Sequence, residues 1–159
     1  HVSKNLTKMT KSKSMSIWFE PVTFEKIERL QQGIDAQGTL MTTLDIKVTV
    51  IGEDSLTATM PVRPTIHQPF GLVHGGASIA LAETVASYAA NFAVDQRHYY
   101  CVGQEINANH LKASRTGMLT AVTKPIHLGK RSSVWEILIH NSDEHLCCVS
   151  RMTAAVVKR

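Results

Sequence analysis

One alanine-rich run constrains the fold more than any other part of this sequence: QPFGLVHGGASIALAETVASYAANFAV, which spans Gln68–Val94. It predicts a helix from about Gly75 to Val94. Apolar residues cover most of the circumference of that helix, so it should be central to the fold. The run holds one charged side chain, Glu83. An ionised carboxylate is almost never fully buried without a partner, because it loses its hydration. Glu83 therefore needs either a chemical role or a structural ion pair with a distant Lys or Arg.

A helix and a hairpin are predicted before this run. The segment PVTFEKIERLQQGI predicts a helix that ends near Gly33 and carries its apolar residues on one face, at Phe24, Ile27, Leu30 and Ile34. Alternating apolar residues then predict two strands joined by a turn at Gly52–Asp54. Their apolar positions are Leu44, Ile46, Val48 and Val50, followed by Leu56, Ala58, Met60 and Val62.

Four strand-like runs follow the central helix: YCVGQEINANHLK, GMLTAVTKPIHL, SSVWEILIHN and HLCCVSRMTAAVV. A short turn at Asn141–Glu144 joins the last two, which favours antiparallel neighbours. The predicted order is one helix, two strands, one buried helix and four strands. This order favours an α+β fold, in which an antiparallel sheet wraps around one long central helix within a single domain at residues 15–159.

The net charge of +4 lies in the first 14 residues and does not indicate nucleic-acid binding. That segment, HVSKNLTKMTKSKS, holds four lysines and no acid. We expect a disordered or artificially added tail there, with Met15 as the natural start. Of the 17 basic and 13 acidic residues in the chain, 13 and 13 then remain. Residues 97–159 hold nine of these basic groups and four of the acidic ones, which suits an anionic ligand or is simply an uneven surface.

A metal site, a disulfide framework and a membrane span are not expected. Cys101, Cys147 and Cys148 show no metal-ligand spacing, and the adjacent pair is a poor candidate for a disulfide. No signal peptide is visible, so a cytoplasmic location is expected. The eight histidines show no H-E-x-x-H or other paired metal spacing. The central run carries too many polar groups to favour a lipid environment.

Two common active-site motifs are absent from the central run. GASIA around Ser78 lacks the final glycine of a G-x-S-x-G elbow, and Gly75–Gly76 is not followed by the Gly-Lys-Ser/Thr of a P-loop. What remains is a glycine pair at a helix N-terminus and a carboxylate inside that helix. Free N–H groups there could stabilise an oxyanion, while Glu83 could act as general base or nucleophile. Ser87, one turn further on, could orient a water molecule or the carboxylate.

Such parts suit the hydrolysis of an activated acyl group, in particular a thioester, because a thiol leaves without an obligatory general acid. Each part also has a purely structural explanation. The glycine pair suits a tight turn that allows close packing, Gln68 and His74 suit satisfied polar groups in a loop, and Glu83 suits an ion pair. Only their coincidence within a short segment favours the catalytic interpretation.

At these residues the chain resembles a known family. QPFGLVHGGASIALAE, GQEINANH and KPIHLGKR resemble hotdog-fold acyl-CoA thioesterases of the phenylacetate-degradation (PaaI-like) type, close to the 4-hydroxybenzoyl-CoA and 1,4-dihydroxy-2-naphthoyl-CoA thioesterases. The likeness runs from about Met15 to Val157, and the combined motifs are specific, whereas HGG alone would be weak. The acyl group stays open, because family members take aromatic and aliphatic acyl-CoAs.

The resemblance implies a role for each matching residue. Glu83 matches the catalytic carboxylate, and the Gly75 N–H matches the group that polarises the thioester carbonyl. Gln68 and His74 match the pair that positions the thioester, and Ser87 stands near the attacking water. Coenzyme A, which is part of the substrate and not a cofactor, would lie along Gly103, His110, Leu111, Lys112, Ala113, His127, Leu128, Gly129, Lys130, Arg131 and Ser132.

Lys112 stands where relatives can carry Arg, so its phosphate contact does not follow directly from the resemblance. Independently of the resemblance, Lys112, Lys130 and Arg131 belong to the positive half of the chain. The resemblance also implies a homodimer with two shared active sites, usually paired into a homotetramer.

Two other functions stay open. A hotdog hydratase or dehydratase also uses a helix carboxylate but resembles a His-Phe-Pro-Gly pattern that this chain lacks, and a non-catalytic acyl-CoA sensor would need an output module.

The spacing of Gly75 and Glu83 also predicts a shared site. Eight residues apart in one helix, they are separated by about 12 Å. The attacker of a carbonyl held by the Gly75 N–H must lie roughly 3 Å from the carbonyl carbon. One copy of the helix cannot supply both groups, but two antiparallel copies related by a two-fold axis can.

Overall fold

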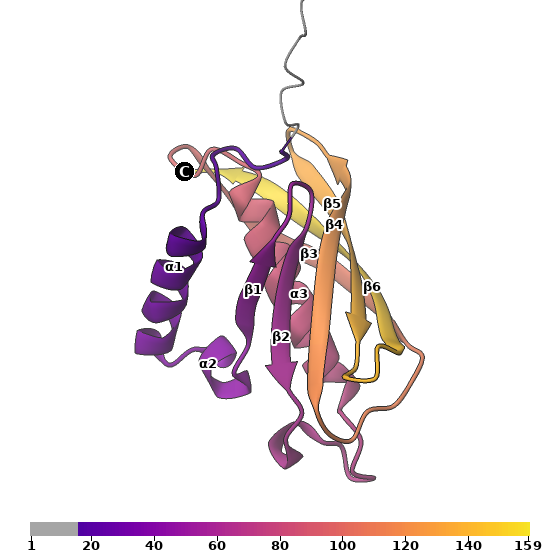
Figure 1. Ribbon diagram of the computed structural model, residues 1–159. Coiled ribbons are helices and arrows are strands. Elements are labelled where there is room, and N and C mark those ends of the chain that lie inside the picture. Colours follow the sequence, from indigo (N-terminus) through magenta and orange to yellow (C-terminus); the bar gives the residue numbers. More distant parts are fainter. Residues whose placement is uncertain (1–15) are drawn as a thin grey trace, which may run out of the picture.

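The computed structural model describes residues 16–159, so the expected tail at residues 1–14 and the expected start at Met15 lie outside the described residues. Within the described part, one antiparallel sheet curves around a long helix, α3 (Gly75–Phe92) (Figure 1). Its strands lie in the order β1 (Lys47–Ile51), β2 (Leu56–Pro61), β4 (Met118–Leu128), β5 (Ser132–His140), β6 (Leu146–Lys158) and β3 (Tyr99–His110). The α+β class is confirmed, and the predicted helices and strands occur in the predicted order, with two short helices that were not predicted in addition.

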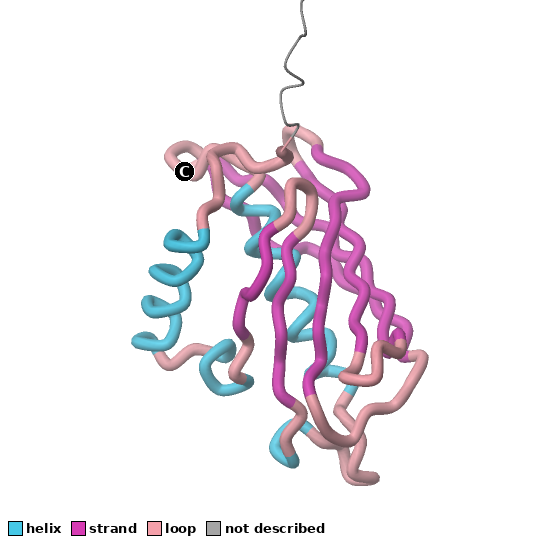
Figure 2. Tube along the Cα trace, viewed as in Figure 1, coloured by secondary structure: helices cyan, strands magenta, loops and turns pink. Residues whose placement is uncertain are grey.

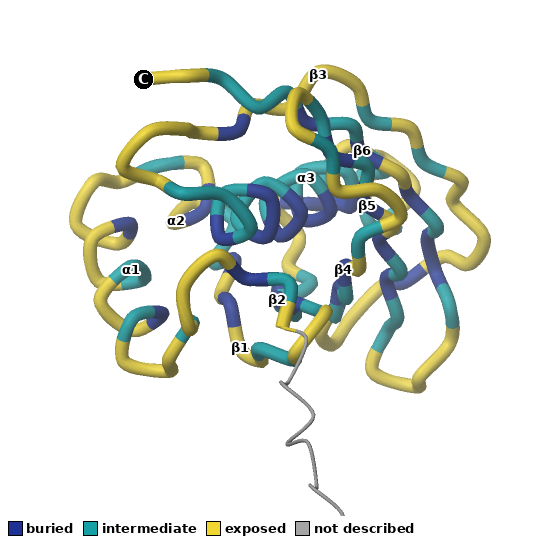
Figure 3. The backbone as a smooth tube through the Cα atoms, turned by 90° about the horizontal axis from the view of Figure 1, so that it is seen from above, coloured by how far each residue is buried: buried dark blue, intermediate teal, exposed yellow. Residues whose placement is uncertain are grey.

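Helix α3 begins where the sequence predicted and ends at Phe92, two residues earlier than expected. Its face toward the sheet is fully buried at Leu81, Val85 and Ala89, and the helix occupies the middle of the molecule when it is viewed from above (Figure 3). The opposite face, which carries Glu83, is only half-buried in this single chain. The apolar circumference of the helix is therefore not fully covered by the described residues.

The N-terminal helix α1 (Phe24–Gln37) extends past Gly33, which was expected near its end. Nothing lies against Gly33, so the glycine costs helix stability without breaking the helix. The helix ends at Gly38, whose φ of 63° is the left-handed conformation of a C-cap. Phe24, expected on the apolar face, is 64% exposed, whereas Ile27 and Ile34 are buried.

The prediction that Leu44 begins the first strand is wrong. Leu40–Leu44 form a short helix, α2, which ends at Asp45 in the left-handed conformation with a φ of 53°. The Thr42 hydroxyl donates to the Ile34 carbonyl of α1 at 3.1 Å, so packing against α1 overrides the strand preference of the Thr pair. The two helices lie beside β1, at the margin of the sheet (Figure 1).

Strand β1 is shorter than predicted and irregular. A bulge between Val48 and Val50 shifts its register against β2, and Val50 is 58% exposed where alternation predicted an inward side chain. A three-residue 3-10 helix, η1 (Pro64–Ile66), follows β2 in the loop that leads to α3. None of the helices within residues 16–159 is long and apolar enough to cross a membrane.

Strand β3 is the last strand in the order and therefore lies at one edge of the sheet, whose strands are drawn in magenta in Figure 2. It pairs with β6 along its whole length, and its other edge pairs with no strand of residues 16–159. Tyr100 and Val102 on this strand are 37% and 43% exposed. A long edge strand with exposed apolar side chains is a template for pairing with another chain.

Candidate active site

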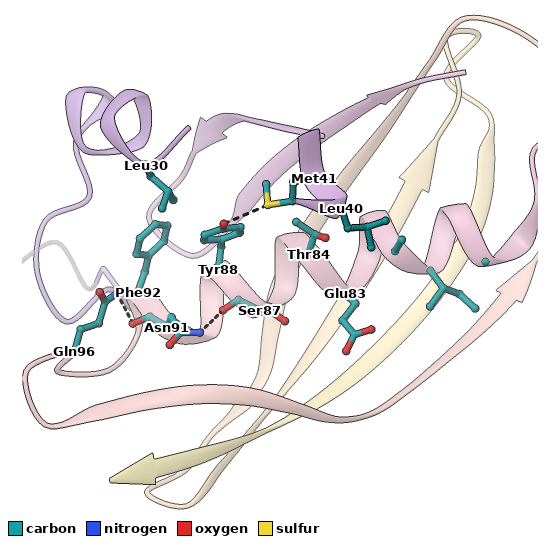
Figure 4. A pocket seen from close by; sticks show the side chains of 13 residues that line it. Leu30, Leu40, Met41, Glu83, Thr84, Ser87, Tyr88, Asn91, Phe92 and Gln96 are labelled. Carbon is teal, nitrogen blue, oxygen red and sulfur yellow. Dashed lines mark hydrogen bonds between the residues drawn. The ribbon is translucent and has the colours of Figure 1, made fainter. Parts of the chain in front are cut away.

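Glu83 projects from the middle of α3 toward β3 and lines a cavity of about 600 Å³ (Figure 4). The cavity runs along α3, and its other lining residues are mostly apolar: Leu30, Leu40, Met41, Gly76, Ile79, Ala80, Thr84, Ser87, Tyr88, Asn91, Phe92 and Gln96. No basic side chain of residues 16–159 lies within ion-pair distance of Glu83, and its carboxylate accepts no hydrogen bond from them. The structural ion pair considered for Glu83 is therefore not formed within the described chain.

Gly103 of β3 provides the space that the Glu83 carboxylate occupies. A Cβ atom on Gly103 would lie 2.7 Å from Oε1 of Glu83, closer than Cβ atoms approach other non-bonded heavy atoms. The strand carries a bulge between Gly103 and Glu105 at the same place. Ser87 lines the same cavity one turn further along the helix, but its hydroxyl lies 3.7 Å from the Met152 sulfur and not on the carboxylate.

The N-terminus of α3 presents hydrogen-bond donors. The Gly76 N–H donates to Nδ1 of His74 at 2.8 Å, so the neutral imidazole carries its proton on Nε2. The Phe70 N–H donates to the Gln68 side-chain oxygen, which leaves the NH₂ group of that amide as the outward donor. The Gly75 N–H has no acceptor among residues 16–159. Three donors are thus available here, and the backbone fixes which polar atom of each side chain points outward.

His110 packs against this N-terminus from the end of β3. A Cβ atom on Gly75 would lie 2.7 Å from Nε2 of His110, so close packing requires a glycine at this position. A second cavity, of about 320 Å³, opens here and is lined by Gln68, Leu72, Val73, Gly75, Ser78, His110, Leu111, Lys112, Ala113, Ser114, Leu119 and Cys147.

Hydrogen bonds to backbone carbonyls join the two loops around this second cavity, one before α3 and one after β3. The Val73 N–H donates to the Ser114 carbonyl at 2.9 Å. The Arg115 guanidinium donates to the carbonyls of Phe70 and Gly71 at 3.3 and 3.4 Å. Gly71 has a φ of 73°, which a side chain would disfavour, and this turn brings the chain back toward His74. These hydrogen bonds therefore hold the loop before α3, which carries the donors, against the loop after β3.

The carboxylate and the donors do not meet within one chain. Glu83 and Gly75 line different cavities and are about 12 Å apart along α3. The residues expected to hold coenzyme A divide in the same way. Leu128, at the start of the Gly129–Ser132 turn, lies on the cross-strand row that contains Gly103, whereas His110 lies about 23 Å further along β3.

The structure thus groups the predicted site residues into two half-sites. We call Glu83, Ser87 and Gly103 the carboxylate half-site, and Gln68, His74, Gly75 and the segment 110–113 the donor half-site. The segment 127–132 lines neither of these two cavities and lies at the Gly103 end of the sheet, three strands away from β3. Within residues 16–159, no group of three His, Cys, Asp or Glu side chains is placed to hold a metal ion.

The apolar lining of the larger cavity was not predicted as part of the site. Tyr88 and Phe92 are four residues apart and therefore share one face of α3, next to the face of Glu83 and Ser87. This helical spacing is the one sequence signal that could have found them. Leu30, Leu40 and Met41 come from α1 and α2, and nothing in the sequence placed these helices over α3.

Comparison with known proteins identifies the family of this chain. The sequence model of the thioesterase superfamily matches residues 70–148. The 1,4-dihydroxy-2-naphthoyl-CoA hydrolase of Escherichia coli K12 is 43% identical over 141 residues, which are 89% of this chain and 99% of that protein. The proofreading thioesterase EntH of Cronobacter turicensis is 44% identical over 142 residues, 89% of this chain and 98% of that protein. The chain belongs to the thioesterase superfamily.

Solved structures place this superfamily member among proteins of the same fold. The crystal structure of a mutant thioesterase from Pseudomonas aeruginosa superposes with a TM-score of 0.84 at 42% identity, covering 91% of this chain and 100% of that one. A thioesterase from Haemophilus influenzae gives 0.81 at 40% identity, covering 89% and 95%. The predictions of the hotdog fold and of a thioester-hydrolase family are confirmed. The roles of the individual site residues stay predictions.

Proposed function

We propose that this chain is an acyl-CoA thioesterase, which hydrolyses an acyl-CoA to a carboxylic acid and coenzyme A. One observation carries the proposal: within residues 16–159, the two half-sites are chemically complementary. One offers an unpaired carboxylate beside an apolar cavity, and the other offers three unpaired donors. A thioester needs both, because its carbonyl carbon is attacked while its carbonyl oxygen gains negative charge.

The half-sites become one active site in a homodimer. The free edge of β3 offers unpaired backbone groups to a second copy. If two β3 strands pair antiparallel about a two-fold axis near their middle, the carboxylate half-site of one chain approaches the donor half-site of the other. Two equal sites then form. Such pairing also covers the half-buried face of α3 and the exposed Tyr100 and Val102.

In this site the thioester oxygen accepts hydrogen bonds from the Gly75 N–H and from the donors of Gln68 and His74. The partner subunit's Glu83 then acts on the carbonyl carbon in one of two ways. As a general base it takes a proton from a water molecule, whose oxygen adds to the carbon. As a nucleophile it adds directly and expels the thiolate, and water then hydrolyses the resulting anhydride. In both routes the C–S bond breaks, a C–O bond forms, and coenzyme A leaves as a thiolate.

The acyl group would occupy the apolar cavity beside Glu83, and coenzyme A would extend over the positive half of the chain. Lys112 belongs to the donor half-site, and Lys130 and Arg131 lie in the turn between β4 and β5. Dimer pairing would bring these cations from the two chains to the same end of the interface, where they suit the phosphates. The names of the relatives support a CoA ester of an aromatic acid as a candidate substrate.

A cytoplasmic homotetramer without a bound cofactor is part of the same proposal. The test is thiol release from a panel of aromatic and aliphatic acyl-CoAs, measured with a thiol reagent for the wild-type chain and for Glu83→Gln. We expect turnover of several esters by the wild type and a loss of about 10³ in kcat for Glu83→Gln. Binding of acyl-CoA without thiol release would favour the sensor function, and addition of water across an enoyl-CoA double bond would favour the hydratase.

A further inference from the structure

One side chain, that of Tyr88, crosses the cavity beside Glu83 part of the way along its length. Tyr88 projects from α3 toward α2, and its hydroxyl reaches Met41 on the far side of the cavity (Figure 4). On one side of this contact lie Glu83 and Leu40, and on the other lie Leu30 and Phe92 (Figure 4). We call the part of the cavity on the Glu83 side of this contact the inner space, and the part on the Leu30 side, below α1, the outer space.

The Tyr88–Met41 contact is specific and partly buried. The hydroxyl donates to the Met41 sulfur at 3.2 Å, and the Tyr88 ring packs on Phe92 with their centroids 6.2 Å apart. Burial raises the pKa of the Tyr88 hydroxyl above its ordinary value of 10.0, so the group stays protonated and remains a donor at neutral pH. Met41 is only 8% exposed.

A hydrogen bond and an ion pair on the outer side of α2 hold this helix in place. The position of Met41 in the cavity wall is therefore fixed. The Thr42 hydroxyl donates to α1 at Ile34, and the Arg63 guanidinium donates to Asp45 at 2.7 Å. Gly38 and Asp45, at the two ends of α2, both have left-handed backbone conformations that turn the chain sharply. The position of α2 is thus set by contacts that do not involve the cavity.

We propose that the Tyr88–Met41 contact is the specificity-determining wall of the acyl cavity and limits how far an acyl group extends from the thioester. This inference rests on the proposed thioesterase function. Tyr88 is five residues after Glu83, about 7.5 Å along the helix axis, whereas Phe92 is about 13.5 Å away. The wall therefore admits a compact group, such as a benzoyl or butanoyl group, and excludes a long straight chain from the outer space.

The test compares benzoyl-, butanoyl-, octanoyl- and hexadecanoyl-CoA with the wild-type chain, Tyr88→Ala and Met41→Ala. We expect kcat/KM for hexadecanoyl-CoA, relative to butanoyl-CoA, to rise about tenfold or more in each variant, because the outer space becomes accessible. Phe24→Ala is the matched control. It removes an aromatic ring from α1 that is 64% exposed and does not line the cavity, so the ratio should not change.

Binding of the same esters to Glu83→Gln, with and without Met41→Ala, separates this inference from the proposed function. A length preference in Kd that shifts with Met41→Ala supports the wall even if the wild-type chain releases no thiol, an outcome that would refute only the hydrolase. Thiol release with a length profile that neither Tyr88→Ala nor Met41→Ala alters would overturn the wall and leave the hydrolase standing. Thermal unfolding checks that each variant is folded, and the two variants remove opposite ends of the contact, so either one suffices.

Discussion

Oε1 of Glu83 lies 2.7 Å from the position that a Cβ atom on Gly103 would occupy. Gly103 has no positive φ, so alanine fits the backbone there, and its methyl group would push the carboxylate aside. We expect Gly103→Ala to lower kcat by about a hundredfold, because a misplacement near 1 Å costs that much when reacting atoms must be aligned. Steady-state kinetics with an acyl-CoA substrate measure the effect.

Gly33→Ala is the control for this substitution. Nothing lies within 4 Å of the added Cβ atom on α1, and alanine favours the helix by roughly 0.5–1 kcal/mol. This variant should keep the wild-type kcat and unfold at a slightly higher temperature. Full activity of Gly103→Ala would mean that the Glu83 carboxylate does not need the position it has here.

Asn91 links the end of α3 to the beginning of β3. Its side-chain NH₂ donates to the Ser87 and Cys101 carbonyls at 2.9 and 3.1 Å, and its oxygen accepts from the Cys101 N–H at 2.8 Å. Asn91→Ala leaves these groups without partners and should lower the free energy of unfolding by about 3 kcal/mol. Urea unfolding at fixed protein concentration checks this. Gln32→Ala, at an exposed position on α1, should stay within about 0.5 kcal/mol of the wild type.

The sequence was sufficient for the elements with a strong local pattern. The start of α3 follows from the His74–Gly75 pair, and β4, β5 and β6 follow from alternation and short turns. Helix α2 could not be predicted, because Thr42 and Thr43 favour a strand and the helix depends on packing against α1.

The candidate site was predicted only in its polar part. Glu83 stood out because a lone carboxylate in an apolar helix is costly, and the helical spacing from Gly75 already predicted that the site divides between two chains. Met41 carries no local signal, and Tyr88 carries only its helical spacing from Glu83, since an aromatic ring or a thioether usually belongs to a core. Their role depends on a contact between residues 47 positions apart, which only the fold reveals.

Cys101 makes stability depend on pH in the alkaline range. Burial raises the pKa of its thiol from the ordinary value of 9.0 to about 11. The unfolded chain releases this proton above pH 9 while the folded chain retains it, so stability is full below pH 9 and falls as the pH rises toward 11. Urea unfolding should show that the wild type loses stability relative to Cys101→Ala over this range, by at most about 1.4 kcal/mol per pH unit. Parallel curves for the two chains would contradict the prediction.

Lys130 and Arg131 should bind the phosphates of coenzyme A. We expect the double variant Lys130→Gln/Arg131→Gln to raise KM about tenfold with little change in kcat, because the contacts are remote from the reacting atoms. The wild-type KM should also rise with ionic strength, since exposed charges are screened, and the double variant should lose much of that dependence. Lys124→Gln is the control, because its cation lies 3.5 Å from Asp54. A double variant with the wild-type KM and salt dependence would place the phosphates elsewhere.

Activity should require one half-site from each of two chains. Glu83→Ala chains lack the carboxylate half-site and Gln68→Ala/His74→Ala chains lack the donor half-site, so each dimer of a single kind should be inactive. A mixed dimer contains one intact site and one doubly defective site. Co-refolding equal amounts makes half of the dimers mixed, which should restore about a quarter of the wild-type activity. Mass spectrometry of the intact complexes measures the mixed fraction. If mixed dimers form and activity does not return, Glu83 and Gly75 must act within one chain, in spite of the 12 Å or so that separates them along α3.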